Sequence, residues 1–154
     1  MRRDIILDVI QKIPGINFNE IVRRTNLSNG VVSHHILQLL KENKIVKSKS
    51  SRAKYFHHSI PKEDMEFIII LRNKTNYDII EFLLRTEFPV TPDAIRKKIK
   101  KSRTTISTNL KKLEKAKLIG RQILNRNSKL TSDIGFYLLD EEFVQEIFSR
   151  YKMQ

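Results

Sequence analysis

The sequence predicts a mainly helical α+β fold built from two tandem copies of one small domain, each closed by a β-hairpin. Three observations predict this fold. The chain of 154 residues aligns with itself when it is shifted by 74 residues. Apolar residues recur at helical spacing in three segments of each copy. Two short, β-prone segments separated by a turn follow the third of those segments. The repeat is the strongest of these observations, because it defines how the chain divides into domains.

Matching positions in the two copies share a chemical type. The shift places Ser28 on Ser102 and Ile36 on Leu110. The other matches are apolar at core spacing or polar near helix starts: Asp4 with Asp78, Ile6 with Ile80, Ile21 with Ile95, Val32 with Ile106, Ser33 with Ser107, Leu39 with Leu113, and Ile45 with Ile119. The predicted plan is a first domain at 1–60, a linking helix at 61–75, a second domain at 76–139, and a C-terminal amphipathic helix at 140–154.

Two helices are predicted at the start of the first copy. Apolar residues one helical turn apart predict the first helix near 3–12, and the dipeptide Pro14-Gly15 ends it. Asn17 is the expected N-cap of the second helix. Glu20 follows three residues later, as in a capping box.

A third helix and a hairpin complete the first copy. Ser28 is the expected N-cap of a helix that runs to about Asn43, with apolar residues every three to four positions. Strands are predicted at 45–48 and 53–58, where β-branched and aromatic residues gather. Residues 50–52 form the turn between them.

The second copy repeats this plan. Thr75 or Asn76 is the expected cap of its first helix. Thr91 and Pro92 open the next helix, because proline at the first helical position removes no hydrogen bond. Ser102 is the expected cap of the third helix. The predicted hairpin has a polar loop at 125–133 and a return strand at 136–139.

Two segments lie outside the repeat. A proline and acids at the start of 61–73, with an arginine at the end, predict the linking helix, although the apolar run at 67–71 also suits a strand. Residues 140–151 carry an apolar stripe through Ile147 and Tyr151. The stripe predicts a homodimer contact or, alternatively, a face that packs inside one chain.

The charge of the chain points to a polyanionic partner. There are 30 Lys and Arg against 17 Asp and Glu, a formal net charge of +13. Between Arg96 and Lys129 there are 13 basic residues and a single acid, Glu114. Such segregation favours a binding surface for nucleic acid over a basic surface kept only for solubility.

Three helices followed by a hairpin are the plan of a winged helix-turn-helix domain. Its capped third helix is narrow enough to enter the major groove of double-stranded DNA. Asn and Gln can bind two atoms of adenine, and Arg can bind guanine. The first copy is expected to present Ser28, Asn29, Gly30, Ser33, His34 and Gln38, and the second Arg103, Thr104, Thr105, Thr108, Lys111 and Lys112. The turns between strands add Arg52 and Lys54 in the first copy, and Arg126 and Lys129 in the second.

The stretch LSNGVVSHHILQLLKENKIV, residues 27–46, resembles the helix-turn-helix core of ArsR- and MarR-type winged-helix regulators, especially small archaeal ones. The stretch SRTTISTNLKKLEKAKLI, residues 102–119, fits the same pattern. Lys101 departs from it, because the first copy has the apolar Leu27 there. The resemblance covers both copies and implies regulation of transcription. Repression is the expected mode, since it needs only occupancy of a promoter.

Other classes of function find little support. The absence of cysteine excludes disulfides and thiolate metal ligands, and it suits a cytoplasmic, nucleoid-associated protein. The adjacent pairs His34-His35 and His57-His58 point their rings in different directions, so no metal site and no cofactor are expected. No phosphate-binding loop or nucleophile motif indicates an enzyme. No apolar run is long enough for a membrane span, and no signal peptide is evident.

Two binding roles remain as alternatives. The first is a protein–protein adaptor in a transcription complex, favoured by Leu37 and Leu40 on the third helix of the first copy. The second is chromatin-like coating of DNA without sequence preference, driven by counterion release. RNA is disfavoured, because its deep groove excludes a helix. A small-molecule effector is left open.

Overall fold

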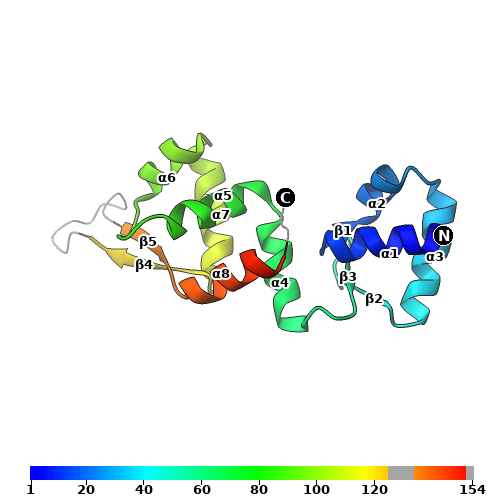
Figure 1. Cartoon of the computed structure of the whole chain (residues 1–154). Coiled ribbons are helices and arrows are strands. Elements are labelled where there is room, and N and C mark those ends of the chain that lie inside the picture. Colours follow the sequence, from blue (N-terminus) through cyan, green and yellow to red (C-terminus); the bar gives the residue numbers. More distant parts are fainter. Residues whose placement is uncertain (125–133, 152–154) are drawn as a thin grey trace. The chain divides into compact units, whose positions relative to one another are not determined.

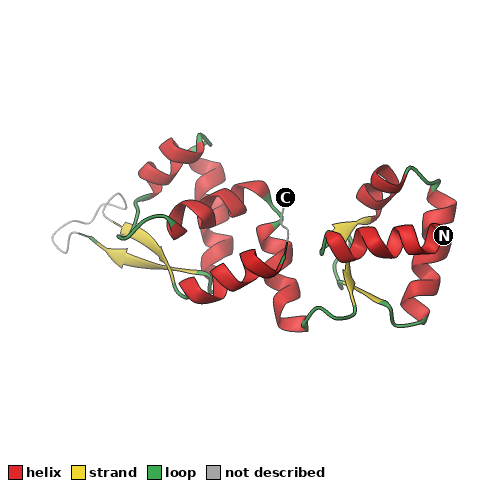
Figure 2. Ribbon diagram, in the orientation of Figure 1, coloured by secondary structure: helices red, strands yellow, loops and turns green. Residues whose placement is uncertain are grey.

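A computed structural model describes residues 1–124 and 134–151 of the chain. The described residues form helices and two small antiparallel sheets (Figure 2). The chain divides into two compact units, Met1–Ile69 with Ile147–Gln154, and Ile70–Glu146. The mainly helical α+β class is therefore confirmed.

The first unit begins with three helices and three short strands (Figure 1). In chain order these are α1 (Arg2–Lys12), β1 (Ile16–Asn17), α2 (Phe18–Thr25), α3 (Asn29–Lys41), β2 (Ile45–Lys47) and β3 (Lys54–His57). The backbone N–H of Glu20 donates to Asn17 Oδ1 at 2.9 Å, and that of Val31 donates to Ser28 Oγ at 3.3 Å. Both predicted caps are thus confirmed. They satisfy N–H groups that the first turn of each helix leaves unpaired.

One continuous apolar core holds these helices against the sheet. Its fully enclosed members include Ile6, Ile21 and Leu39, each with no exposed surface. The remaining buried members are Ile10, Ile16, Val32, Ile36, Ile45 and Tyr55. The core uses the stripe of each helix that the sequence marks as apolar, so α3 turns its polar side outward.

The sheet of the first unit has one strand more than the sequence predicts. Its order is β1-β3-β2, and Ile16 of β1 pairs with Tyr55 of β3. Strand β1 has only two residues, which is too short to show the alternation of apolar and polar side chains that predicts a strand. Residues 53–58 and 45–48, predicted as strands, pair over the shorter ranges of β3 and β2.

The second unit has the same order of helices. Its elements are α5 (Lys74–Leu84), α6 (Pro92–Ile99), α7 (Arg103–Lys115), β4 (Ile119–Ile123) and β5 (Ile134–Leu138). Thr91 Oγ1 accepts from the Ala94 N–H at 3.2 Å, with Pro92 at the first helical position. Ser102 Oγ accepts from the Thr105 N–H at 3.1 Å. These two caps are also confirmed.

Backbone turns recur at the spacing of the sequence repeat. Asn26 and Lys100 end α2 and α6 in the left-handed conformation, with φ of 56° and 62°. Asn43 and Lys117, which follow α3 and α7, do the same with φ of 57° and 61°. Each pair is 74 residues apart. Left-handed backbone is costly for residues other than glycine, so its recurrence reflects the same chain reversal in both places.

The junction between the units departs from the predicted linking helix at 61–75. The structure has α4 (Lys62–Leu71), and α5 begins at Lys74. The predicted cap at Thr75 or Asn76 is wrong, because Asn73 Oδ1 accepts from the Asn76 N–H at 3.1 Å. The side chain of Asn76 is buried and donates to the Ile70 carbonyl at 3.1 Å. It closes the end of α4 and cannot cap α5. The run at 67–71 is helical, so the alternative of a strand is wrong.

The C-terminal helix α8 (Glu141–Arg150) uses its apolar stripe within the chain. Val144 and Ile147 are buried, and the Tyr151 hydroxyl donates to Asp64 Oδ2 at 2.6 Å. The stripe is therefore covered without a second copy, in agreement with the alternative of an internal packing face.

The hairpin of the second unit pairs over five residues in each strand. The return strand, predicted at 136–139, begins two residues earlier, because Ile134 and Gly135 extend the pairing to Ile123 and Gln122. The predicted loop at 125–133 lies outside the described residues.

Candidate nucleic-acid interface

Helix α3 presents the polar side that the sequence predicts. Ser28, Asn29, Gly30, Ser33, His34 and Gln38 are all exposed. The Ser28 hydroxyl caps the helix by accepting from the Val31 N–H, and this bond fixes the orientation of the Ser28 side chain. A side chain built at Gly30 would meet nothing within 4 Å, which leaves the backbone open to a ligand. Leu37 lies among these residues and is 57% exposed.

Helix α7 presents a more basic side. Arg103, Thr104, Thr108, Lys111 and Lys112 are exposed. Thr105 differs, because it is half-buried and its Oγ1 accepts from the Ser102 hydroxyl at 2.9 Å. The structure therefore places Thr105 in the cap and not among the outward side chains.

The predicted contacts of the hairpins are only partly visible. Arg52 is exposed in the turn between β2 and β3. Lys54 is half-buried at the start of β3, paired with Asn17, so it belongs to the sheet and not to the turn. Arg126 and Lys129 lie outside the described residues.

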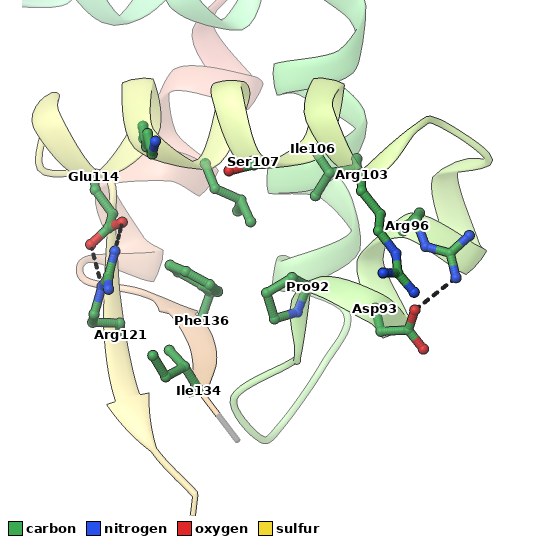
Figure 3. A pocket seen from close by; sticks show the side chains of 12 residues that line it. Pro92, Asp93, Arg96, Arg103, Ile106, Ser107, Glu114, Arg121, Ile134 and Phe136 are labelled. Carbon is green, nitrogen blue, oxygen red and sulfur yellow. Dashed lines mark hydrogen bonds and ion pairs between the residues drawn. The ribbon is translucent and has the colours of Figure 1, made fainter. Parts of the chain in front are cut away.

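A cleft of about 610 Å³ runs between α7 and the β4–β5 hairpin and reaches the start of α6 (Figure 3). Its apolar lining comes from Pro92, Ile106, Leu110, Ile134 and Phe136. Its polar lining comes from Asp93, Arg96, Arg103, Ser107, Lys111, Glu114 and Arg121. A mostly apolar hollow with a few converging charges is a common form of ligand site.

An ion pair joins α7 to the hairpin across this cleft. Arg121 Nε donates to Glu114 Oε2 at 2.9 Å, and a terminal nitrogen of Arg121 donates to Oε1 at 2.6 Å. The guanidinium carbon lies 5.6 Å from the centre of the Phe136 ring, within the range of a cation–π contact. Hydrogen bonding to Arg121 lowers the pKa of Glu114, and the same bonds raise the pKa of Arg121. Both groups are therefore charged at neutral pH.

The start of α6 holds a second cluster of charges. The Asp93 carboxylate accepts from Arg96 at 2.7 Å and lies 3.2 Å from Lys97 Nζ. Hydrogen bonds from Arg96 and then Lys97 lower the pKa of Asp93. Arg96 Nε is enclosed and has no hydrogen-bond partner within the described residues. Asp93 thus neutralises part of the basic charge at this end of the cleft.

The histidines stay in two separate pairs. The rings of His34 and His35 lie 5.2 Å apart with their planes at 67°. His34 is exposed, whereas His35 is half-buried. His57 is the half-buried member of the other pair, and burial, followed by the charges of His58 and Lys44, lowers its pKa. Among residues 1–124 and 134–151, no three His, Cys, Asp or Glu side chains gather where they could hold a metal ion.

None of the helices in residues 1–124 and 134–151 is both long enough and apolar enough to cross a membrane.

Sequence reasoning missed part of this site. Arg96, Ser107, Arg121 and Phe136 line the cleft, yet they are absent from the predicted contacts. One signal was present: Glu114 is a single acid within a long basic segment, and an isolated acid often has a specific basic partner. A second basic segment was also overlooked. Residues 23–54 hold eight Lys and Arg and one acid, Glu42, which pairs with Arg3.

Comparison with known proteins bears on the first unit. Residues 1–66 match the family HTH_HVO_0163_N, described as an N-terminal HTH domain. The N-terminal part of the chain is therefore a helix-turn-helix domain of the DNA-binding type, as the sequence predicts. No curated protein matches the chain.

Two solved structures align over nearly the whole chain, but only loosely. One is a conserved hypothetical protein from Chlorobium tepidum, at 11% identity and a TM-score of 0.38, with 96% of this chain and 97% of that chain covered. The other is ScpB from Mycobacterium tuberculosis, at 10% identity and a TM-score of 0.37, with 95% of this chain and 94% of that chain covered. TM-scores this low say nothing about the function of the present chain. The match of residues 1–66 concerns the N-terminal domain, which it describes as a helix-turn-helix domain.

Proposed function

We propose that this chain is a transcription regulator that binds double-stranded DNA through two tandem winged helix-turn-helix domains, related to ArsR- and MarR-type regulators. Its role is binding and not catalysis. Repression is the proposed mode, because occupancy of a promoter is enough to block transcription. The helix-turn-helix match of residues 1–66 supports the first domain. The repeat of caps and left-handed turns at a spacing of 74 residues supports the second.

The observation that carries the proposal is the exposed side of α7. Arg103, Lys111 and Lys112 project from a helix that begins at a serine cap. Glu114, whose charge is already paired with Arg121, is the one acid in α7. A helix of this width with cations on its open side suits the major groove, where Arg and Lys read guanine or hold phosphates.

The test is the affinity of the full chain for a duplex from the region upstream of its own gene, measured against a shuffled duplex at about 0.15 M salt. Specific binders prefer their site by roughly 10³-fold or more. A preference of that size supports a site-specific regulator. Equal and salt-sensitive binding to both duplexes would favour the chromatin-like role or an operator elsewhere.

A second candidate is a protein adaptor, favoured by one observation. Leu37 is 57% exposed on the side of α3 that would face DNA, where an apolar side chain gains nothing from phosphates. If circular dichroism shows that the chain is folded and it binds neither duplex, the adaptor role would be favoured over DNA binding.

A further inference from the structure

The cleft of the second unit lies between two elements that the proposed function assigns to different grooves of DNA. In B-form DNA a sugar–phosphate strand separates the major groove from the minor groove beside it. If α7 enters one groove and the β4–β5 hairpin reaches the next, that strand must pass between them. The space available there is the cleft of about 610 Å³.

We propose that this cleft seats one sugar–phosphate strand, and that Glu114 holds the Arg121 guanidinium in place of a phosphate until DNA arrives. This inference rests on the proposed function. It assigns a phosphate-binding role to Arg121 and makes Glu114 the competitor of that phosphate.

The lining of the cleft suits both the sugar and the phosphate groups of a DNA strand. Pro92 and Ile134, which are only half-buried, offer apolar surface to the C–H groups of deoxyribose. Arg103 and Lys111 have no ion pair within the described residues, so their charges are available to phosphate oxygens. Backbone contacts of this kind position a protein without reading sequence.

The geometry of the ion pair suits an exchange of partners. Both donors of Arg121 engage the two oxygens of Glu114, and a phosphate offers the same pair of acceptors to a guanidinium. The Phe136 ring lies against the guanidinium and keeps its orientation when the partner changes. The Arg121 side chain is 54% exposed, so a strand in the cleft can reach it. An ion pair this exposed changes an equilibrium by no more than about fivefold, so a phosphate can displace the carboxylate.

The exchange gives Glu114 a role in setting the general affinity for DNA. Every duplex offers phosphates, so a free Arg121 would strengthen binding to any sequence. A carboxylate that occupies Arg121 lowers this general affinity. The correct site offers the same phosphate, so Glu114 lowers the affinity for every duplex by the same factor, and discrimination is left to the contacts of α7 with base edges.

The experiment measures the affinity of the full chain for a duplex of random sequence, as wild type and as Glu114→Gln. The substitution is expected to tighten binding about fivefold, because Arg121 loses its competitor. Glu81→Gln is the matched control. Glu81 is paired with Arg85 at 2.7 Å on α5 and does not line the cleft, so this change is expected to alter affinity less than twofold. Arg121→Ala should reduce the slope of log affinity against log salt by about 0.9, the loss of one phosphate contact.

The double variant separates exchange from a general effect of charge. In an Arg121→Ala background, Glu114→Gln should change affinity no more than the Glu81→Gln control does. Duplexes in which a single phosphate is replaced by a neutral methylphosphonate provide a second measurement. Replacement of the phosphate that contacts Arg121 should abolish the increase in affinity caused by Glu114→Gln.

Two results would overturn the inference while leaving the proposed function intact. They are unchanged or weaker binding by a folded Glu114→Gln variant, and a gain that persists without Arg121. If the wild type binds no duplex at all, the proposed function fails and the inference fails with it.

Discussion

The third helices of the two units, α3 and α7, share a scaffold and differ in surface chemistry. Each begins at a serine cap, three residues after the last residue of the helix before it. At matched exposed positions, α3 has Asn29 and Gln38 where α7 has Arg103 and Lys112. Amides read base edges, whereas cations also bind phosphates without regard to sequence. The capping and buried positions therefore define each helix. The exposed positions can differ, so that α3 carries amides suited to base edges and α7 carries cations suited to phosphates.

The hairpins of the two units are held in different ways. In the first unit β1 adds a third strand to the sheet. In the second unit the corresponding pairing is a single bridge between Val90 and Phe136. There the Glu114–Arg121 pair adds a tie between helix and hairpin. The first unit has Leu40 and Lys47 at these two positions, so it has no such tie.

Substitutions in the two cores should have the largest effect on the stability of the units. Leu113→Ala and the matched Leu39→Ala each remove a side chain with no exposed surface. Each is expected to cost about 2–5 kcal/mol of unfolding free energy. Urea unfolding with hydrogen exchange should localise each loss to its own unit. Leu37→Ala, at an exposed position, is the control, with a change below about 0.5 kcal/mol. Equal loss of protection in both units after a single substitution would contradict separate cores.

The division of binding work can be tested with paired double variants. Arg103→Ala with Lys112→Ala should weaken binding by about 2–3 kcal/mol and lower the salt slope by about 1.8. Asn29→Ala with Gln38→Ala should lower discrimination between bases by about 1–3 kcal/mol and leave the slope unchanged. Fluorescence anisotropy across a salt series measures both quantities. Unchanged affinity and slope in the first variant would show that α7 is not a DNA-binding surface.

The contact of Tyr151 with Asp64 has no counterpart to be matched in the second unit, because both residues belong to the first unit. Asp64 is 5% exposed and accepts from the Tyr151 hydroxyl. Tyr151→Phe removes that donor and should cost about 1.5 kcal/mol in thermal or urea unfolding. Tyr137→Phe, at an exposed strand position, should cost little.

Tyr151 also predicts a dependence on pH. Burial and then the Asp64 hydrogen bond raise the pKa of Tyr151 from 10.0 to about 12. A raised pKa means that the folded state favours the protonated phenol. The contribution is fully present below pH 10 and is lost as the pH rises through about 12. The difference between wild type and Tyr151→Phe should therefore shrink at high pH, and a difference that grows would contradict this sign.

The smallest expected effects are those of the caps. Ser28→Ala and Ser102→Ala should each cost about 1 kcal/mol. Ser102→Ala should be the costlier of the two, because its hydroxyl also donates to Thr105. Ser28→Asn and Ser102→Asn retain a capping oxygen and serve as controls. A larger loss at Ser28 than at Ser102 would show that the hydroxyl pair adds nothing.

The local features of the fold could be predicted because each depends on residues close in sequence. A cap joins residues three apart, as in the bond from Thr105 to Ser102. The helical stripes follow from the same short period. The outward sides of α3 and α7 were therefore predictable. Thr105 was the exception, since its hydroxyl bonds within the cap.

The cleft could not be predicted in the same way. Arg121 comes seven residues after Glu114, with a chain reversal at Lys117 between them. The sequence shows an isolated acid but not which of the surrounding cations it meets. The pairing of Asn73 with α5 was missed for a related reason, because Asn76 is an equally good cap in isolation and is recruited by the Ile70 carbonyl.

The repeat, most of the helix caps and the basic character of α7 could be read from the sequence, since these features depend on local spacing and composition. The packing of the C-terminal stripe, the pairing of β1 with β3 and the lining of the cleft could be seen only in the folded chain. Tyr151 and Asp64 are 87 residues apart. Contacts at that separation depend on how whole elements pack, and many packings satisfy the same local pattern. Burial and hydrogen bonding across the assembled unit select one of them.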